Sequence, residues 1–254
     1  MSLSQELEEK RDTLESVAGR DYLTKELKDY FHAQLIFVSS NIEEVVISLE
    51  EAEDIVAQYP DFKPIPADNT VLLQAKGQKI ALDYAEDLGR GDQPITVDTV
   101  RTIHRMVFDQ ADPEIAGWYR EELIKIRATE FIPTIHYFIP GEMKDFDDRL
   151  RQDLPSTDAS IWDILSFATW AHYEVVRIHP FKDGNGRVAR ILFNLICRRY
   201  NLPYVLIPKS GTEQRMWDGL HAADQGDIRQ LLRYYAELLG ESYDYIIGEY
   251  QKKS

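Results

Sequence analysis

The residues best suited to chemistry in this 254-residue chain are clustered between His179 and Arg190. The run reads His-Pro-Phe-Lys-Asp-Gly-Asn-Gly-Arg-Val-Ala-Arg. It places a candidate base, His179, close to a candidate metal carboxylate, Asp183, a glycine-flanked turn and two arginines. This combination of residue types is typical of a site that binds nucleotide phosphates and stabilises the charge that moves during their transfer.

The middle of this run predicts a binding site for an anion. Gly184 and Gly186 lack a Cβ atom, so the backbone between them can adopt positive φ and direct successive N–H groups into one concavity. The largely apolar run from Ile191 to Ile196 predicts a buried helix, whose first N–H groups and positive dipole end would face the same anion. We expect Arg187 and Arg190, three residues apart, on one face of its first turn, where each could bind a phosphate.

The nine fixed positions of this run match the motif of Fic proteins, His-Pro-Phe-x-Asp-Gly-Asn-Gly-Arg-x-x-Arg, without a departure. The chain therefore resembles the Fic family. The resemblance implies nucleotidyltransferase activity, most often transfer of AMP from ATP, with Mg²⁺, to a hydroxyl side chain of a target protein. A loop before an ordinary basic helix would explain each residue singly, but not all of them together.

This chemistry gives each group of the motif a predicted role. Removing the proton of a Ser, Thr or Tyr hydroxyl suits a neutral imidazole near pH 7, so His179 is the predicted general base. Asp183 is expected to hold Mg²⁺, because a site with one protein carboxylate suits an ion that keeps several waters. Asn185 is expected to hydrogen-bond the α-phosphate. Arg187 and the amides of Gly184 to Gly186 are expected to bind the pyrophosphate.

A second pattern, Ser39-Ser40-Asn41-Ile42-Glu43, lies in the N-terminal third. It resembles the inhibitory motif of the family, in which Ser or Thr is followed by three residues, then by Glu, and then by Gly or Asn. The resemblance implies a self-inhibited subclass, in which Glu43 pairs with Arg190 and keeps it from the γ-phosphate of ATP. Glu44 departs from the usual Gly or Asn, and its carboxylate could strengthen the block or shift the helix end. The alternative is a solvated acidic helix end.

Apolar and polar residues alternate across a proline-containing turn between Gly117 and Pro140, which predicts a β-hairpin. The segment resembles the flap of the family, which binds the target as an added strand and aligns its hydroxyl. Thr134, Ile135 and His136 are the predicted docking residues. A plain surface hairpin would explain the alternation equally well.

The segment from Pro208 to Asp227 resembles the part of the family fold that lines the nucleoside pocket. Trp217 stands where an aromatic residue packs on adenine, and Asp224 where an acid or amide contacts the base or ribose. A plain helix with one buried tryptophan would also explain these residues.

The rest of the chain is dominated by helical periodicity, which predicts an all-α bundle with the small β-hairpin flap. Leu23, Leu27, Phe31 and Leu35 step by four, and Ser48 to Glu51 has the form of a capping box. Prolines between Tyr59 and Asp68 mark a loop. Further helices are expected from Asn69, after Pro94, after Pro140, from Ile161 to Ile178, and after Thr212. We expect an N-terminal helical region over 1–66, packed as one unit with a catalytic core over 67–254.

The composition of the chain disfavours some classes of binding partner. The chain has 29 basic and 44 acidic residues and a net charge of −15, which disfavours non-specific attraction to nucleic acid or an anionic membrane. No apolar run approaches the roughly 18 residues of a membrane span. We therefore expect ATP and a target protein as partners, no nucleic acid, no membrane, and the cytoplasm as location. A homodimer is one candidate assembly.

The same residues are compatible with other activities. The fold could support a phosphotransferase, although Gly186 argues against it because the toxin relatives with that activity carry Lys there. Glu43 could instead position a water that removes AMP from a modified partner. The chain could also be a regulatory module whose locked site is catalytically silent.

Overall fold

The computed structural model describes residues 1–125, 131–207 and 213–253, and these residues form helices and no strand. The helices follow in this order: α1 (Leu3–Ala18), α2 (Lys25–Ile42), α3 (Leu49–Ala57), α4 (Thr70–Arg90), α5 (Val97–Phe108), the 3₁₀ turn η1 (His136–Phe138), α6 (Ile139–Gln152), α7 (Ile161–Ile178), α8 (Asn185–Arg199), α9 (Glu213–Asp224) and α10 (Arg229–Lys253). The all-α prediction is confirmed for this part of the chain, whereas the predicted hairpin is not seen in it.

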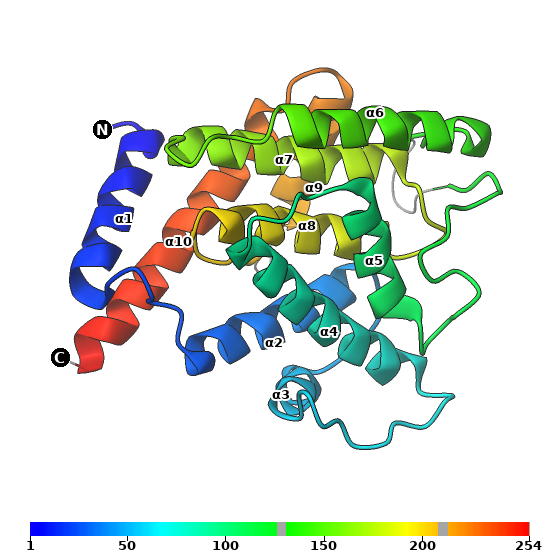
Figure 1. Ribbon diagram of the computed structural model, residues 1–254, viewed down its shortest axis with the longest axis horizontal. Coiled ribbons are helices and arrows are strands. Elements are labelled where there is room, and N and C mark those ends of the chain that lie inside the picture. Colours follow the sequence, from blue (N-terminus) through cyan, green and yellow to red (C-terminus); the bar gives the residue numbers. More distant parts are fainter. Residues whose placement is uncertain (126–130, 208–212, 254) are drawn as a thin grey trace.

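Helix α8, which follows the motif, lies at the centre of the bundle (Figure 1). All of its residues except Gly186 and Arg199 are buried. It packs against α7 and against α4, and α5 covers α4 in turn. A helix enclosed by neighbours holds its first turn in a fixed position, so the loop that precedes it is positioned by the core.

Side-chain caps stand at the starts of several helices. The Ser160 hydroxyl accepts the N–H of Asp163 where α7 begins, and α7 ends at Ile178 as predicted. The capping box at the start of α3 is present, because Ser48 and Glu51 each accept the backbone N–H of the other. The prolines of residues 60–66 lie in a non-helical stretch, as predicted.

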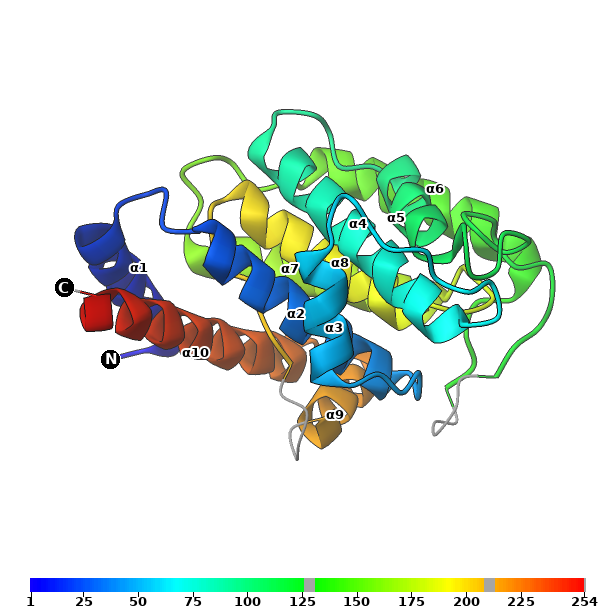
Figure 2. The same ribbon diagram turned by 90° about the horizontal axis from the view of Figure 1, so that it is seen from below.

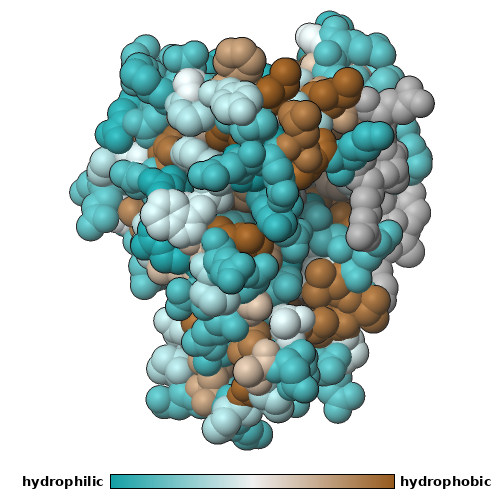
Figure 3. Space-filling view, turned by 90° about the vertical axis from the view of Figure 1, so that its right-hand side faces the viewer, coloured by the Kyte–Doolittle hydropathy of each residue, from teal (hydrophilic) through white to brown (hydrophobic). Residues whose placement is uncertain are grey.

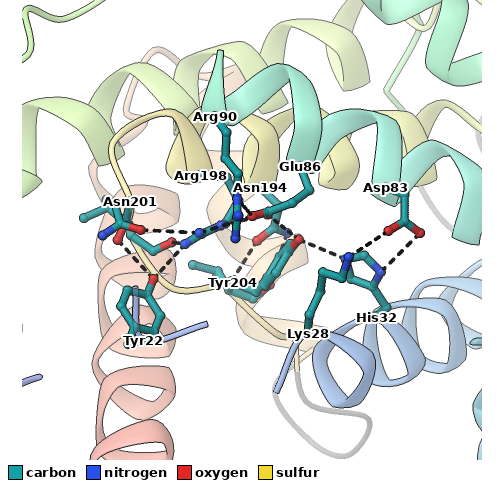
Figure 4. A network of polar contacts seen from close by, with 12 residues as sticks. Tyr22, Lys28, His32, Asp83, Glu86, Arg90, Asn194, Arg198, Asn201 and Tyr204 are labelled. Atoms are coloured by element: carbon teal, nitrogen blue, oxygen red, sulfur yellow. Dashed lines mark hydrogen bonds and ion pairs between the residues drawn. The ribbon is translucent and has the colours of Figure 1, made fainter. Parts of the chain in front are cut away.

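A buried polar network fastens α2 to the core (Figure 4). Its centre is Glu86 of α4, which accepts hydrogen bonds from the Tyr204 hydroxyl (2.7 Å) and from Arg198 Nε of α8 (2.9 Å). Tyr204 also bonds His32 of α2 (2.9 Å), and Arg198 bonds the Tyr22 hydroxyl (2.7 Å). Because the network joins α2, α4 and α8, it fixes the helix that carries Ser39.

The structure adds one helix that the spacing of apolar residues did not indicate. Helix α1 buries only Leu7 and Leu14 and packs on α10 at the end of the bundle where the two termini lie (Figure 2). No helix of the described residues is long and apolar enough to cross a membrane. The division of the chain near residue 66 stays a prediction.

Candidate active site

His179 is the residue that ends α7. Its backbone is left-handed (φ 52°, ψ 59°), and its N–H still bonds Val175 O at 3.0 Å. Its Nδ1 lies 3.1 Å from Val176 O, and a carbonyl can only accept, so Nδ1 carries the proton and Nε2 the lone pair. Burial lowers the pKa of His179 below 6.5, against the opposing effects of the Val176 hydrogen bond and the Glu43 carboxylate. The imidazole is therefore neutral near pH 7, with Nε2 able to accept a proton.

The turn after His179 is braced by Asn185. The Asn185 side chain is buried, accepts the N–H of Phe181 (2.9 Å) and donates to Phe181 O (2.9 Å). Phe181 thus uses the oxygen and one N–H of the amide, and a hydrogen bond from the other N–H to the α-phosphate stays a prediction. Gly184 has φ 75°, and a Cβ there would lie 2.4 Å from the Phe108 ring, so both the turn and its packing require glycine.

Asp183 projects from the same turn and is half exposed (51%). Its Oδ1 accepts a hydrogen bond from the N–H of Gly184 at 2.6 Å, and its backbone O accepts one from His104 Nε2 at 3.1 Å. No group of three or more His, Cys, Asp or Glu in the described ranges could hold a metal. A single exposed carboxylate fits Mg²⁺, which takes its other oxygens from water and phosphates.

The histidine that holds Asp183 is neutral and structural. His104 accepts the N–H of Gly117 through Nδ1 (2.8 Å), and its ring stacks on Phe181 with centroids 3.9 Å apart. Burial lowers the pKa of His104 to about 4. Because each nitrogen has a fixed hydrogen-bond role, His104 positions the turn and has no proton to exchange near pH 7.

Arg187 lies deeper than the sequence suggested. Its side chain is fully buried, donates to Gln74 and to Asp183 Oδ1 (3.1 Å), and packs over the Phe108 ring. The side chain thus neutralises Asp183 from the protein interior. The spacing of Arg187 and Arg190 suggested that both guanidinium groups would be available to a ligand. The structure shows instead that Arg187 is buried, whereas Arg190 faces the acidic end of α2.

Arg190 is bound by the end of α2. Its Nη2 lies 2.8 Å from Glu43 Oε1, and its Nε donates to the Ser39 hydroxyl at 2.8 Å. The predicted pair between Glu43 and Arg190 is therefore present, and Ser39 takes part in it. The arginine is nearly buried, whereas about a quarter of the Glu43 side chain is exposed. A charge-assisted bond of this kind is stronger than one between neutral groups.

Glu44 occupies the position where α2 ends in a left-handed turn. Its φ is 60°, its N–H bonds Asn41 O (3.1 Å), and the N–H of Val45 bonds Ser40 O (3.0 Å). This pair of bonds is the Schellman motif, whose left-handed residue is usually Gly and sometimes Asn. The structure thus gives a backbone reason for the Gly or Asn that the inhibitory motif normally carries, and an exposed Glu in this place is strained.

The sequence model of the Fic/DOC family matches residues 94–197, which run from just before α5 to near the end of α8. This segment contains every group of the turn described above. Over residues 94–197 the chain is a Fic/DOC domain. The match places its Fic motif, His179 to Arg190, on the turn and the first helical residues of α8.

Curated relatives and solved structures extend the similarity over nearly the whole chain. Protein adenylyltransferase Fic of Aedes aegypti is 30% identical over 241 residues, 94% of this chain and 46% of the relative. The protein of the same name from Nematostella vectensis is 33% identical over 242 residues, 94% of this chain and 54% of the relative. The chain therefore spans about half the length of the curated relatives it matches.

Among solved structures, Fic-1 from C. elegans has a TM-score of 0.78 at 27% identity and covers 98% of this chain, which covers 73% of it. A Fic domain containing signaling protein from Bacteroides thetaiotaomicron has a TM-score of 0.81 at 20% identity, with 98% of each chain covered. The second likeness shows a shared fold, including the helices before the motif.

The segment predicted as the flap of this Fic domain lies at the end of the bundle that Figure 3 faces. Residues 126–130, in its middle, lie outside the described residues, and the flanking residues 121–125 and 131–135 have no strand. The strand prediction is wrong for His136 and Tyr137, which form the turn η1 before α6. Ile135 (46%) and Tyr137 (81%) are exposed, so the segment still presents apolar side chains to solvent.

The two residues predicted near the nucleoside both lie on α9. Trp217 is partly exposed (40%), so the alternative of a buried tryptophan is not what the structure shows. Asp224 Oδ1 accepts a hydrogen bond from the Tyr173 hydroxyl of α7 at 3.1 Å, and burial raises the pKa of Asp224. Pro208 and Lys209, quoted with them in the sequence, lie outside the described residues.

Proposed function

We propose that this Fic protein is a protein adenylyltransferase. A Ser, Thr or Tyr hydroxyl of a target attacks the α-phosphorus of ATP, and the bond from that phosphorus to the bridging oxygen breaks. AMP is then joined to the target as a phosphodiester, and pyrophosphate leaves. The relatives that carry the name protein adenylyltransferase support this proposal.

The observation that carries the proposal is the hydrogen bond between His179 and Val176 O. It leaves the lone pair on Nε2, and the lowered pKa of the buried ring keeps that nitrogen unprotonated near pH 7. His179 Nε2 therefore takes the hydroxyl proton as the oxygen attacks. A base fixed in one tautomer is ready for this transfer without rearrangement.

The groups that receive the nucleotide lie after His179 in the same turn. The first N–H groups of α8, at Asn185 and Gly186, have no partner inside their helix and would face the phosphates. Asp183 would hold Mg²⁺, which neutralises phosphate charge as the pyrophosphate leaves. Arg190 would bind the γ-phosphate, and Arg187 would act through Asp183. Trp217 and Asp224 would contact the nucleoside.

We further propose that Glu43 inhibits the protein. Its carboxylate occupies Arg190 and lies against the start of α8, where a phosphate would bind. One guanidinium cannot satisfy both anions in the same geometry. Thr134, Ile135 and His136 would dock the target beside His179. The cytoplasm as location and a homodimer as assembly stay predictions.

Removal of AMP from a modified partner is the second candidate. The specific observation in its favour is that the Glu43 carboxylate lies against Gly186 at the start of α8, where it could orient a water beside a bound phosphate. In that reaction the oxygen of water attacks the phosphorus of the phosphodiester, and the bond from phosphorus to the target oxygen breaks. The target oxygen takes up a proton that the water gives up, and AMP is released.

One experiment distinguishes these functions. The wild-type chain, Glu43→Gly, and Glu43→Gly with His179→Ala are incubated with a cell extract and Mg²⁺ and either α-labelled or γ-labelled ATP. Adenylyl transfer predicts label only from the α-position, strongest in Glu43→Gly and lost with His179→Ala. Label from the γ-position would show a phosphotransferase, and no label in any variant would contradict the proposal. Release of AMP from the labelled proteins by the wild type, but not by Glu43→Gly, would support removal.

A further inference from the structure

A buried arginine outside the Fic motif contacts the candidate base. Arg120, which is only 5% exposed, follows Tyr119 near the start of the predicted flap. Its Nε donates to the backbone O of His179 at 2.8 Å, and its own N–H donates to Pro180 O at 2.9 Å. The side chain and the backbone of Arg120 thus bind the consecutive carbonyls of His179 and Pro180, where the catalytic turn begins.

The other two nitrogens of the same guanidinium bind backbone carbonyls further along the predicted flap. Nη1 donates to Glu122 O at 2.6 Å, and Nη2 donates to Thr134 O. Glu122 and Thr134 lie on either side of residues 126–130, so the guanidinium holds both arms of the segment that encloses them. Three carbonyls from three parts of the chain converge on one planar group.

This guanidinium also lies in the wall of a cavity. The cavity has a volume of about 640 Å³ and is lined by Arg120 together with Trp118, His136 and Tyr137. Trp118 is 63% exposed and Tyr137 is 81% exposed, so apolar surface surrounds its mouth. A peptide segment bound in the cavity would contact Arg120, which is itself hydrogen-bonded to the backbone O of His179.

We infer that Arg120 is a positioning residue that sets the distance and orientation between the docked target segment and the His179 base. The inference rests on the proposed transfer to a protein hydroxyl. A planar guanidinium with fixed donors suits this task, because it bonds several carbonyls at set angles, whereas the single ammonium of lysine cannot reproduce that fork. Small errors in such a placement are costly, since a misplacement of about 1 Å can reduce a reaction rate about 100-fold.

Arg120 also acts electrostatically on the base. The charged groups that influence His179 are Glu43 and Asp183, which raise its pKa, and Arg120, which lowers it. Removing the charge of Arg120 should therefore raise the pKa of His179. Lysine at the same position keeps the charge but loses carbonyl contacts, so the two effects can be separated.

The test compares Arg120→Lys and Arg120→Met, made in the Glu43→Gly background, with Arg101→Met as the matched control. Arg101 lines the same cavity but donates to Gly117 O and packs on Trp118. Four quantities are measured: AMP transfer to a defined set of hydroxyl-bearing peptides, the dissociation constant of ATP with Mg²⁺, the pH titration of the His179 ring by NMR, and hydrogen exchange of the backbone amides.

We expect both Arg120 variants to lose transfer by about 10-fold to 100-fold while the ATP dissociation constant changes less than about 3-fold. The His179 titration should move to higher pH in Arg120→Met and stay near its original position in Arg120→Lys. Exchange should rise at residues 131–135 and 180–182 in both Arg120 variants but not in Arg101→Met. A merely structural arginine would not separate Lys from Met in the titration.

Two results would overturn the inference. One is unchanged transfer in Arg120→Met, and the other is an unchanged His179 titration together with unchanged exchange in that variant. Absence of transfer in the Glu43→Gly parent itself would contradict the proposed function. The titration and the exchange data need no activity, so they would still decide whether Arg120 links the segment to His179.

Discussion

The carboxylate of Glu43 lies directly against Gly186, where a Cβ atom would come within 2.1 Å of Oε1. Gly186 is in the first turn of α8 and has no positive φ, unlike Gly184. The expectation that both glycines shape the turn through positive φ is therefore wrong for Gly186. Its missing side chain makes room for an anion at the start of the helix. Glu43 fills that room in this structure.

Replacing Glu43 with Gly should raise self-modification. The change frees Arg190 from its 2.8 Å contact and clears the start of α8, so the γ-phosphate can bind there. Coupling between two sites is typically about 1–3 kcal/mol, so we expect an increase of roughly 5-fold to 150-fold. Incorporation of α-labelled ATP without added target measures it. Unchanged labelling in a folded variant that still binds ATP would rule out self-inhibition by Glu43.

Replacing Gly186 with Ala should weaken ATP binding by about tenfold, or roughly 1.4 kcal/mol, even in the Glu43→Gly background. The added methyl group takes the space of the anion, whether this is the Glu43 carboxylate or a phosphate. Calorimetric titration with ATP and Mg²⁺ gives the constant. Gly248→Ala is the control, because a Cβ there meets nothing within 4 Å. Equal affinities in Gly186→Ala and Gly248→Ala would contradict the steric explanation.

Replacing Glu44 with Gly should stabilise the protein and leave the Glu43 contact in place. A non-glycine residue in left-handed conformation destabilises the folded state by about 1–2 kcal/mol. Glycine removes this cost, but its greater freedom in the unfolded chain offsets about 0.4–1 kcal/mol of the gain. The expected gain is therefore roughly 0.5–1 kcal/mol in the free energy of unfolding, measured with urea. Activation by Glu44→Gly alone, equal to that by Glu43→Gly, would show instead that the two carboxylates share the block.

Transfer should depend on the neutral form of His179. Because burial lowers the pKa of His179 below 6.5, the rate should be constant around pH 7 and fall as the pH drops through that lowered pKa. The Glu43→Gly protein should lose activity at still lower pH, since removing a carboxylate lowers the imidazole pKa further.

His179→Ala should abolish transfer with ATP affinity nearly intact. A loss of affinity of about tenfold or more would contradict the assigned role.

Replacing Asp183 with Ala should remove the effect of Mg²⁺ on ATP binding. The half-exposed carboxylate is the only acidic side chain of the motif, and its loss leaves Arg187 without its partner in the turn. Titrations with and without Mg²⁺ should differ in the wild type and coincide in the variant. A Mg²⁺ effect that persists would place the metal on other groups.

Local chemistry made much of the architecture predictable. The cap at Ser48, the bounds of α7 and the turn from His179 to Gly184 depend on neighbours within a few residues, which the sequence displays directly. Helix α1 was not predicted, because it buries only two leucines. These leucines are buried by α10, which lies far along the chain, and local sequence does not show that contact.

The sequence by itself determined the Fic motif and the helical class, because fixed residue types at fixed spacing carry that information. Its resemblance to the inhibitory motif implied the pairing of Glu43 with Arg190, which the structure then showed. Only the tertiary structure decided which polar partners the site residues take. Asn185 is bound by Phe181, Arg187 by Gln74, and Arg120 reaches from the start of the predicted flap to His179. A buried polar group must find a hydrogen-bond partner, and the partner available to it is set by the elements that packing brings alongside.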